Sequence, residues 1–267
     1  MEFIIHVEQF EKMIDNKIIG IPKLVNTKIN FRGKNNILVC DNNVELNNVV
    51  LDFNGNNSIV YLGSNLTNNF KLLIYNNSTV YMGRDIKLGD SVNLKVLESH
   101  NLIIGDDCVI GDNVTIVTSE GYSIHDATSK KRINFSNSVY IGDHVFLGDH
   151  SYVSQGVNIG SGAIVSNMSF IPPNFKLHSN TISSGNPIKT LKQNVFFTND
   201  YLGPYSIKDS LDSKEYISDV FIFNFVNGET LSMNELEKVL LKLDVESRLD
   251  FIQKLFVRNK RKNRFFM

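Results

Sequence analysis

The chain lacks several features that define common protein classes. It has no tryptophan, five prolines and two cysteines, Cys40 and Cys108, among 267 residues. Two cysteines so far apart in sequence make neither a disulfide framework nor a zinc motif, so we expect two buried thiols in a reducing compartment. The formal net charge is −1. This balance gives no sign of the basic surface that a nucleic-acid-binding domain needs.

Long hydrophobic runs are absent as well. No stretch reaches the roughly 18 apolar residues of a membrane-spanning helix. The apolar stretch near the N-terminus is too short for the core of a signal peptide. The sequence therefore predicts a cytoplasmic protein without a nucleic-acid partner. Hydrophobic residues still make up 42% of the chain, which is enough for a substantial core.

What the chain does have is a six-residue repeat. Aliphatic residues occupy seven consecutive positions at this spacing: Ile141, Leu147, Val153, Ile159, Val165, Ile171 and Leu177. The same register runs through Ile104, Ile110 and Ile116, and through Met82, Leu88 and Leu94. A period of six fits neither a helix nor a continuous strand, but it fits a short strand followed by a corner. Three such strands make one triangular coil with the aliphatic residue inside. The predicted fold class is all-β, a parallel β-helix of hexapeptide repeats.

Two other patterns agree with such coils. Small residues recur inside the hexads, at Cys108, Val114, Val145, Ser151, Val157 and Ala163. Cys108 is therefore predicted to lie in the core and not to act as a catalytic thiol. Asparagine is frequent throughout the chain. It suits tight corners because it tolerates a positive φ.

The repeat also suggests a division of the chain. Residues 1–33 are interpreted as an N-terminal cap, 34–192 as the β-helix and 193–267 as a C-terminal extension that is helical from about residue 232. Within the β-helix, residues 117–138 have no six-step register and are predicted to form an extruded loop, which is usually functional in a regular solenoid. Ser232, with Glu235 three residues later, is a helix-start signal.

The last ten residues are basic and end in apolar side chains, Phe265-Phe266-Met267. One interpretation is a frayed, solvated terminus. The other is weak attraction to an anionic membrane surface or glycan, which would place the protein at the periphery of the inner membrane.

Several motifs in this order resemble the hexapeptide-repeat acetyltransferases, in particular the bacterial O-acetyltransferases of capsule and lipooligosaccharide sugars. The similarity covers about residues 56–192. It rests on the segments Thr118–Asp126, Lys131–Asn134, Ile141–Gly148, Ile171–Asn174 and Ser184–Lys189. The resemblance implies a left-handed β-helix in a homotrimer, with acetyl-CoA as acyl donor bound between neighbouring subunits. It implies a saccharide acceptor, such as sialic acid or another capsule or lipooligosaccharide residue.

In the same family a loop histidine takes the proton from the sugar hydroxyl, a task that suits an imidazole near neutral pH. This chain has Tyr122 where relatives usually carry that histidine, and a histidine three residues later, His125. Three explanations stay open. His125 is the base; another histidine such as His144 or His150, or a partly activated Tyr122, replaces it; or the transfer chemistry is lost. Phe146 stands where many relatives have tryptophan.

For the donor, the resemblance points to small and polar residues of the later coils. Ser166, Asn167, Ser183 and Ser184 are expected along the pantetheine arm, and Lys189 and Lys192 at the phosphates.

Two other functions compete with this one. A metal enzyme on the same scaffold would need three converging histidines. His144 and His150 are six residues apart, on adjacent sides of the triangle, and no metal is expected. A non-catalytic binding or scaffold protein is the alternative that Tyr122 suggests. The corner positions of His144 and His150 predict side chains that face outward.

Overall fold

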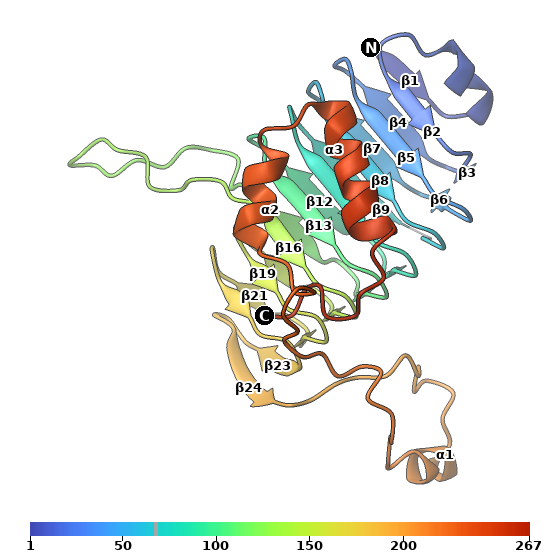
Figure 1. The fold of residues 1–267 in the computed structure, drawn as a ribbon, viewed down its shortest axis with the longest axis vertical. Helices are drawn as coiled ribbons and strands as arrows, with labels where there is room; N and C mark the ends of the chain where they lie inside the picture. The colour runs from blue at the N-terminus through green and yellow to red at the C-terminus, as the bar shows by residue number, and fades with distance from the viewer. Residues whose placement is uncertain (67–68) are drawn as a thin grey trace.

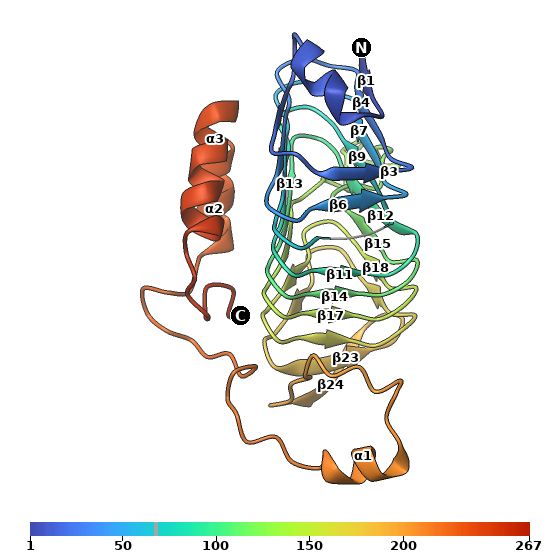
Figure 2. The same cartoon turned by 90° about the vertical axis from the view of Figure 1, so that its right-hand side faces the viewer.

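The computed structural model describes residues 1–66 and 69–267, and most of them form parallel coils stacked into a three-sided column (Figure 1). The first sheet contains β1 (Glu2–Ile4), β4 (Lys28–Phe31), β7 (Val50–Phe53), β9 (Phe70–Ile74), β12 (Val92–Val96), β15 (Thr115–Val117), β18 (Tyr152–Val153) and β21 (Phe170–Ile171). The second contains β2 (Lys17–Ile19), β5 (Ile37–Cys40), β8 (Ile59–Leu62), β10 (Thr79–Met82), β13 (Asn101–Ile104), β16 (Val139–Ile141), β19 (Asn158–Ile159) and β22 (Lys176–Leu177). The third contains β11 (Lys87–Leu88), β14 (Val109–Ile110), β17 (Phe146–Leu147), β20 (Ile164–Val165), β23 (Thr181–Ser184) and β24 (Lys189–Gln193). A separate pair, β3 (Lys23–Val25) and β6 (Glu45–Asn47), lies above β11 in Figure 2.

The hexad aliphatics fill the interior of this column. All seven from Ile141 to Leu177 are at most 1% exposed, and Cys108 is fully buried among them. Because each strand pairs in parallel with the equivalent strand of the next coil, these side chains stack into one continuous core. The predicted left-handed parallel β-helix is thus confirmed, as is the core position of Cys108.

Corner residues adopt the left-handed backbone conformation that lets the chain turn. Asn35, Asn57 and Asn77 have φ near +55° and stack across three coils. Asn35 donates its side-chain amide to Asn57 over 2.8 Å, and Asn57 donates to Asn77 over 3.3 Å. Asparagine suits these corners because it tolerates positive φ and because its short polar side chain can hydrogen-bond to the asparagine of the neighbouring coil.

The glycine that follows many strands has a steric cause. A Cβ on Gly105 would lie 2.5 Å from Oδ1 of Asp143 in the next coil. That oxygen accepts a hydrogen bond of 2.7 Å from the N–H of Asp106. The Gly-Asp pairs of the sequence therefore link successive coils through the corners.

The coils begin earlier than the sequence predicts. β2 already pairs in parallel with β5, and β4 with β7, so the segment 1–33 contains a coil as well as a cap. Corner contacts in the early coils join residues 20 or 22 positions apart, against 18 in the late coils. This longer spacing conceals the repeat. The part that caps the column is β1, antiparallel to β4, with the short 3-10 helix Val7–Lys12. At the other end β24 pairs antiparallel with β23.

Residues 233–257 of the C-terminal extension cover the outer face of the second sheet (Figures 1 and 2). Its helices are α1 (Ile207–Asp212), α2 (Met233–Leu240), α3 (Val245–Ile252) and a π-helical turn, Gln253–Val257. Ser232 caps α2 by accepting the N–H of Glu235, and Asp244 caps α3. Leu240, Ile252 and Phe256 pack against outward-facing Tyr61, Tyr81 and Tyr140 of the sheet. Among the described residues, no helix combines the length and apolarity needed to cross a membrane.

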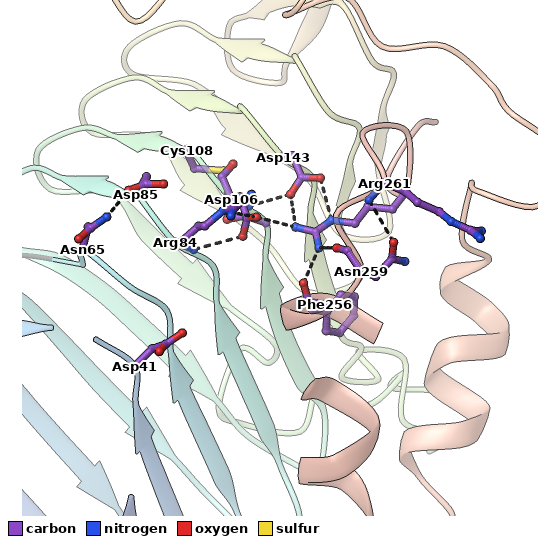
Figure 3. Close-up of polar contacts among 12 residues, drawn as sticks. Asp41, Asn65, Arg84, Asp85, Asp106, Cys108, Asp143, Phe256, Asn259 and Arg261 are labelled. Carbon is purple, nitrogen blue, oxygen red and sulfur yellow. Dashed lines mark hydrogen bonds and ion pairs between the residues drawn. The ribbon is translucent and has the colours of Figure 1, made fainter. Parts of the chain in front are cut away.

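The basic tail is docked, so the prediction of a frayed terminus was wrong. Arg264 and Phe265 are 2% and 0% exposed. The Arg264 guanidinium lies 2.7 Å from Asp143 and 3.2 Å from Asp106, and it donates to the carbonyls of Phe256 and Asn259. Figure 3 shows Asp106 and Asp143 on the coil facing the segment with Asn259. A buried arginine paired with two carboxylates holds the end of the chain on the column.

We predict that Arg264→Met destabilises the folded protein by about 3–5 kcal/mol, because the largely buried Asp143 loses its counter-charge. Asp106 keeps its ion pair with Arg84. Arg258→Met is the matched control, since Arg258 belongs to the same tail and is exposed. Urea unfolding followed by circular dichroism measures both. Equal unfolding midpoints for the two variants would show that Arg264 does not anchor the tail.

Candidate functional site

An apolar stripe runs along the outer face of the third sheet. Strand pairing places Lys87, Val109, Phe146, Ile164 and Ile182 one above the other on successive coils. The next residue of each of the first four strands points inward, because side chains alternate between the two faces of a strand. The four apolar residues of the stripe are half-buried. At the lower end, Ile182 pairs with Lys192 of β24, so the stripe ends at a lysine.

Part of the C-terminal extension closes over the upper half of this stripe. Residues 197–203 and the strand residues Lys87, Val109 and Phe146 line a hollow of about 520 Å³. The Phe197 ring lies 5.9 Å from the Phe146 ring. Asn199 donates to both carboxylate oxygens of Asp107, at 3.1 and 3.0 Å. A largely apolar groove next to a few polar groups is the usual form of a small-molecule site.

His144 holds the extension against the coil. Its Nδ1 lies 2.8 Å from Oδ2 of Asp107 and its Nε2 lies 2.9 Å from the carbonyl oxygen of Phe197. The ring is stacked between Phe197, at 3.9 Å, and Phe221, at 4.2 Å. Both partners of the ring nitrogens are acceptors, so the imidazole donates from both sides when protonated and has no lone pair left for a substrate.

The expectation that His144 faces outward was therefore wrong. It is 2% exposed, whereas His150 at the equivalent corner of the next hexad is exposed as predicted. The extension that covers His144 carries no repeat that would show where it lies. Burial acts to raise the pKa of Asp107, but hydrogen bonds from His144 and Asn199 outweigh it and hold the pKa below its usual value.

Residues 118–138 leave the column between β15 and β16 as a long arm (Figure 1). The arm is two antiparallel segments: Ile133 donates its N–H to Ile124 and Asp126 donates to Lys131, both over 2.9 Å. Asn134 ties them together through hydrogen bonds with Glu120, Tyr122 and Ile124. Asp126 accepts the N–H groups of Thr128 and Ser129, so it caps the turn at the tip and does not orient an imidazole.

Hydrogen bonds and an ion pair anchor the base of the arm to the column, whereas the side chains along the arm are exposed. Arg132 forms a bidentate pair with Glu98, at 2.8 Å for both contacts, and Ser136 also donates to Glu98. These hydrogen bonds lower the pKa of Glu98 to about 2. Tyr122 is 86% exposed and His125 is exposed as well. Within the described part of one chain, neither side chain makes a hydrogen bond with the third sheet.

The predicted donor-binding residues gather at the lower end of the third sheet, with differences in detail. Ser184 pairs with Lys189 across the β23–β24 hairpin, and Lys192 lies on the same hairpin. Ser183 is 1% exposed, so its side chain does not line the surface. Asn167 uses its side-chain oxygen to accept the N–H of Asp149. Ser166 lies next to it at the corner after β20 and is half-buried.

Comparison with known proteins agrees with this architecture. The family model for the hexapeptide repeat of succinyl-transferase matches residues 101–126 and 138–171. The crystal structure of the polysialic-acid-specific acetyltransferase NeuO matches with a TM-score of 0.65 and 27% identity, over 74% of this chain and 95% of that one. The chain thus resembles the hexapeptide-repeat acetyltransferases in its repeat and in its fold. The polysialic acid O-acetyltransferase OatWY shares the fold, with a TM-score of 0.65 and 22% identity over 74% of this chain and 94% of that one. No curated protein sequence matches significantly.

The predicted resemblance to this family and the predicted acyltransferase class are thus confirmed. Sequence reasoning missed one component of the candidate site, the wall formed by residues 197–203. This wall has no period of its own. Its one signal is the high aromatic content of residues 196–225, which begins with Phe196-Phe197, since aromatic side chains in a linker indicate a docked segment.

We predict that His144→Asn releases this wall, because asparagine keeps the left-handed corner but cannot reach both Asp107 and Phe197. Amide exchange at residues 196–203 should accelerate on the order of tenfold or more, as expected for lost hydrogen bonds to a charged group. His150→Asn is the control, since φ is 54° at His144 and 58° at His150. Unchanged exchange in His144→Asn would show that neither the hydrogen bonds nor the stacking of His144 holds the wall.

Proposed function

We propose that this hexapeptide-repeat protein transfers an acetyl group from acetyl-CoA to a hydroxyl of a bacterial surface sugar of the sialic acid type. The observation that carries the proposal is the apolar stripe from Phe146 to Ile182, with its lysine-bearing lower end. It offers the two features that a CoA thioester requires: an apolar surface for the pantetheine arm and cations for the phosphates. The donor residues are then Ser166, Ser184, Lys189 and Lys192.

We assign the general base to His125. Its imidazole takes the proton of the sugar hydroxyl while the oxygen attacks the thioester carbonyl carbon. The tetrahedral intermediate then collapses with cleavage of the C–S bond. The thiolate of CoA leaves and is protonated from the imidazolium, so that no covalent enzyme intermediate forms. Tyr122 is a less suitable base because an ordinary phenol has a pKa near 10. His144 has both nitrogens occupied and serves as a positioning residue for residues 197–203.

The arm and the groove belong to different subunits in this proposal. The arm projects away from the column, and its exposed apolar residues, Ile124, Ile133 and Phe135, are 48%, 63% and 67% exposed. Such a surface on a rigid arm fits a neighbouring copy of the chain. A homotrimer places each arm against the next subunit's third sheet, since the chain's own helices already cover the second sheet.

The direct test measures free CoA thiol released from acetyl-CoA in the presence of sialic acid oligomers. His125→Ala should lower kcat by about 100-fold or more, the usual contribution of a general base. His150→Ala, an exposed histidine outside the arm, should match the wild type. Wild-type kcat in His125→Ala would contradict the assignment and leave Tyr122 as the base. Binding of acetyl-CoA without turnover by the wild type would favour a non-catalytic binding protein.

A subunit-mixing experiment tests the shared site. His125→Ala lacks the base and Phe146→Asp disrupts the groove, so each variant alone should be inactive. Refolding the two together should restore activity, because some interfaces then combine an intact arm with an intact groove. Failure to recover activity in oligomers shown to be mixed would mean that arm and groove act within one chain.

A further inference from the structure

The docked tail displays a group of cations without carboxylate partners. Arg258, Lys260, Arg261 and Lys262, here called the basic turn, are all exposed. Among the described residues, no carboxylate lies within ion-pair distance of any of the four. The nearby carboxylates are engaged elsewhere: Asp250 pairs with Lys254, and Asp106 and Asp143 pair with Arg264. In a chain whose net charge is −1, this is a local excess of positive charge.

The basic turn is held in a fixed shape. Its backbone wraps around the buried Arg264 guanidinium, which binds the carbonyls on both sides of Arg258, at Phe256 and Asn259. Lys262 donates to the carbonyl of Asp219 over 2.6 Å, and Arg261 donates to the carbonyl of Gly228. Figure 3 shows Arg261 on the side of the cluster away from the coil residues Asp41 and Asp85. A charged surface ordered in advance loses less entropy when a ligand binds.

The turn borders two hollows. One, of about 530 Å³, is lined by Lys254, Arg258, Asn259, Lys260 and Arg261. The other, of about 290 Å³, is lined by Lys260, Arg261 and Lys262 together with Val220 and Phe221. The carboxylates of Asp106, Asp107 and Asp143 also line it, and they are paired with Arg264 and His144. Lys260 and Arg261 belong to both hollows, so the cationic surface is continuous. The second hollow also reaches His144, whose other side borders the wall of the apolar groove.

The burial of the tail's apolar residues distinguishes between two anionic partners, a membrane surface and a water-soluble polyanion. Insertion into a membrane surface needs apolar side chains next to the cations. Phe265 is fully buried, and Phe266 and Met267 are half-buried against the column. Within the tail itself, the exposed side chains are the charged ones, and no aromatic anchor is exposed beside them. A water-soluble polyanion fits this surface better than a lipid bilayer.

We infer that the basic turn is a second binding site for the acceptor, separate from the transfer site, which holds a carboxylate-bearing polysaccharide such as a sialic acid polymer. This inference rests on the proposed function for the identity of the polymer. Successive carboxylates of the polymer pair with Arg258, Lys260, Arg261 and Lys262, while another part of the same polymer enters the transfer site. Tethering raises the local concentration of acceptor groups. Long polymers therefore gain from the site and short oligomers do not.

The test uses the triple variant K260Q/R261Q/K262Q and the control K12Q/K17Q/K28Q, which removes three exposed charges at the other end of the column. KM for long sialic acid polymers should rise about tenfold in the first variant, as expected for several exposed ion pairs of modest strength. Its kcat, and its KM for a sialic acid trimer, should match those of the wild type and of the control. Added salt should weaken polymer use by the wild type more than by the variant.

Direct binding separates this inference from the proposed function. Fluorescently labelled sialic acid polymer should bind the wild type and the control about tenfold more tightly than the K260Q/R261Q/K262Q variant, whether or not acetyl transfer occurs. Tighter binding without transfer would keep the second site and remove the proposed reaction. Equal polymer binding and equal KM in wild type and variant would overturn the inference. So would charge-dependent binding to phosphatidylserine vesicles or to RNA without binding to the polymer.

Discussion

The structure depends on one backbone constraint, the left-handed conformation at the corners of each coil. Asn57, Asp107 and His144 are three of the residues that adopt it. Each such corner turns the chain so that the following strand lies directly over its counterpart, and parallel hydrogen bonding with inward aliphatic packing follows. The position of nearly every functional feature then follows from the coil and from the face of the column to which its residues belong.

The three faces have different roles as a result. The second sheet packs against the chain's own C-terminal helices through outward tyrosines such as Tyr81. The third sheet carries the apolar stripe at Phe146 and the wall that His144 holds. The arm leaves from the edge between the first and second sheets, and apolar side chains such as Ile124 and Ile133 stay exposed on it. The molecule thus presents a groove and an arm that its own geometry keeps apart.

The regular hexads could be predicted from the sequence. The geometry of the triangular coil brings every sixth residue to the interior, so that an aliphatic side chain recurs at that spacing. The first coils were harder to predict, since corners enlarged by residues such as Asn35 and Asn57 shift the spacing to 20 or 22. The roles of Arg264 and His144 could not be predicted from the sequence. Each depends on a contact between segments far apart in sequence, and no repeat indicates such a contact. Arg264 in particular lies in a run of basic residues from which nothing local distinguishes it.

A stack of parallel coils is in principle endless, since its first and last coils expose unpaired backbone groups to any further strand. This chain ends its first sheet with β1 and its third sheet with β24, and both run against the direction of the coil. An antiparallel strand interrupts the parallel register that another coil of the same sense would need. Two of the column's sheet edges are thereby made unsuitable for axial growth into fibres, whereas the second sheet ends in the parallel strands β2 and β22.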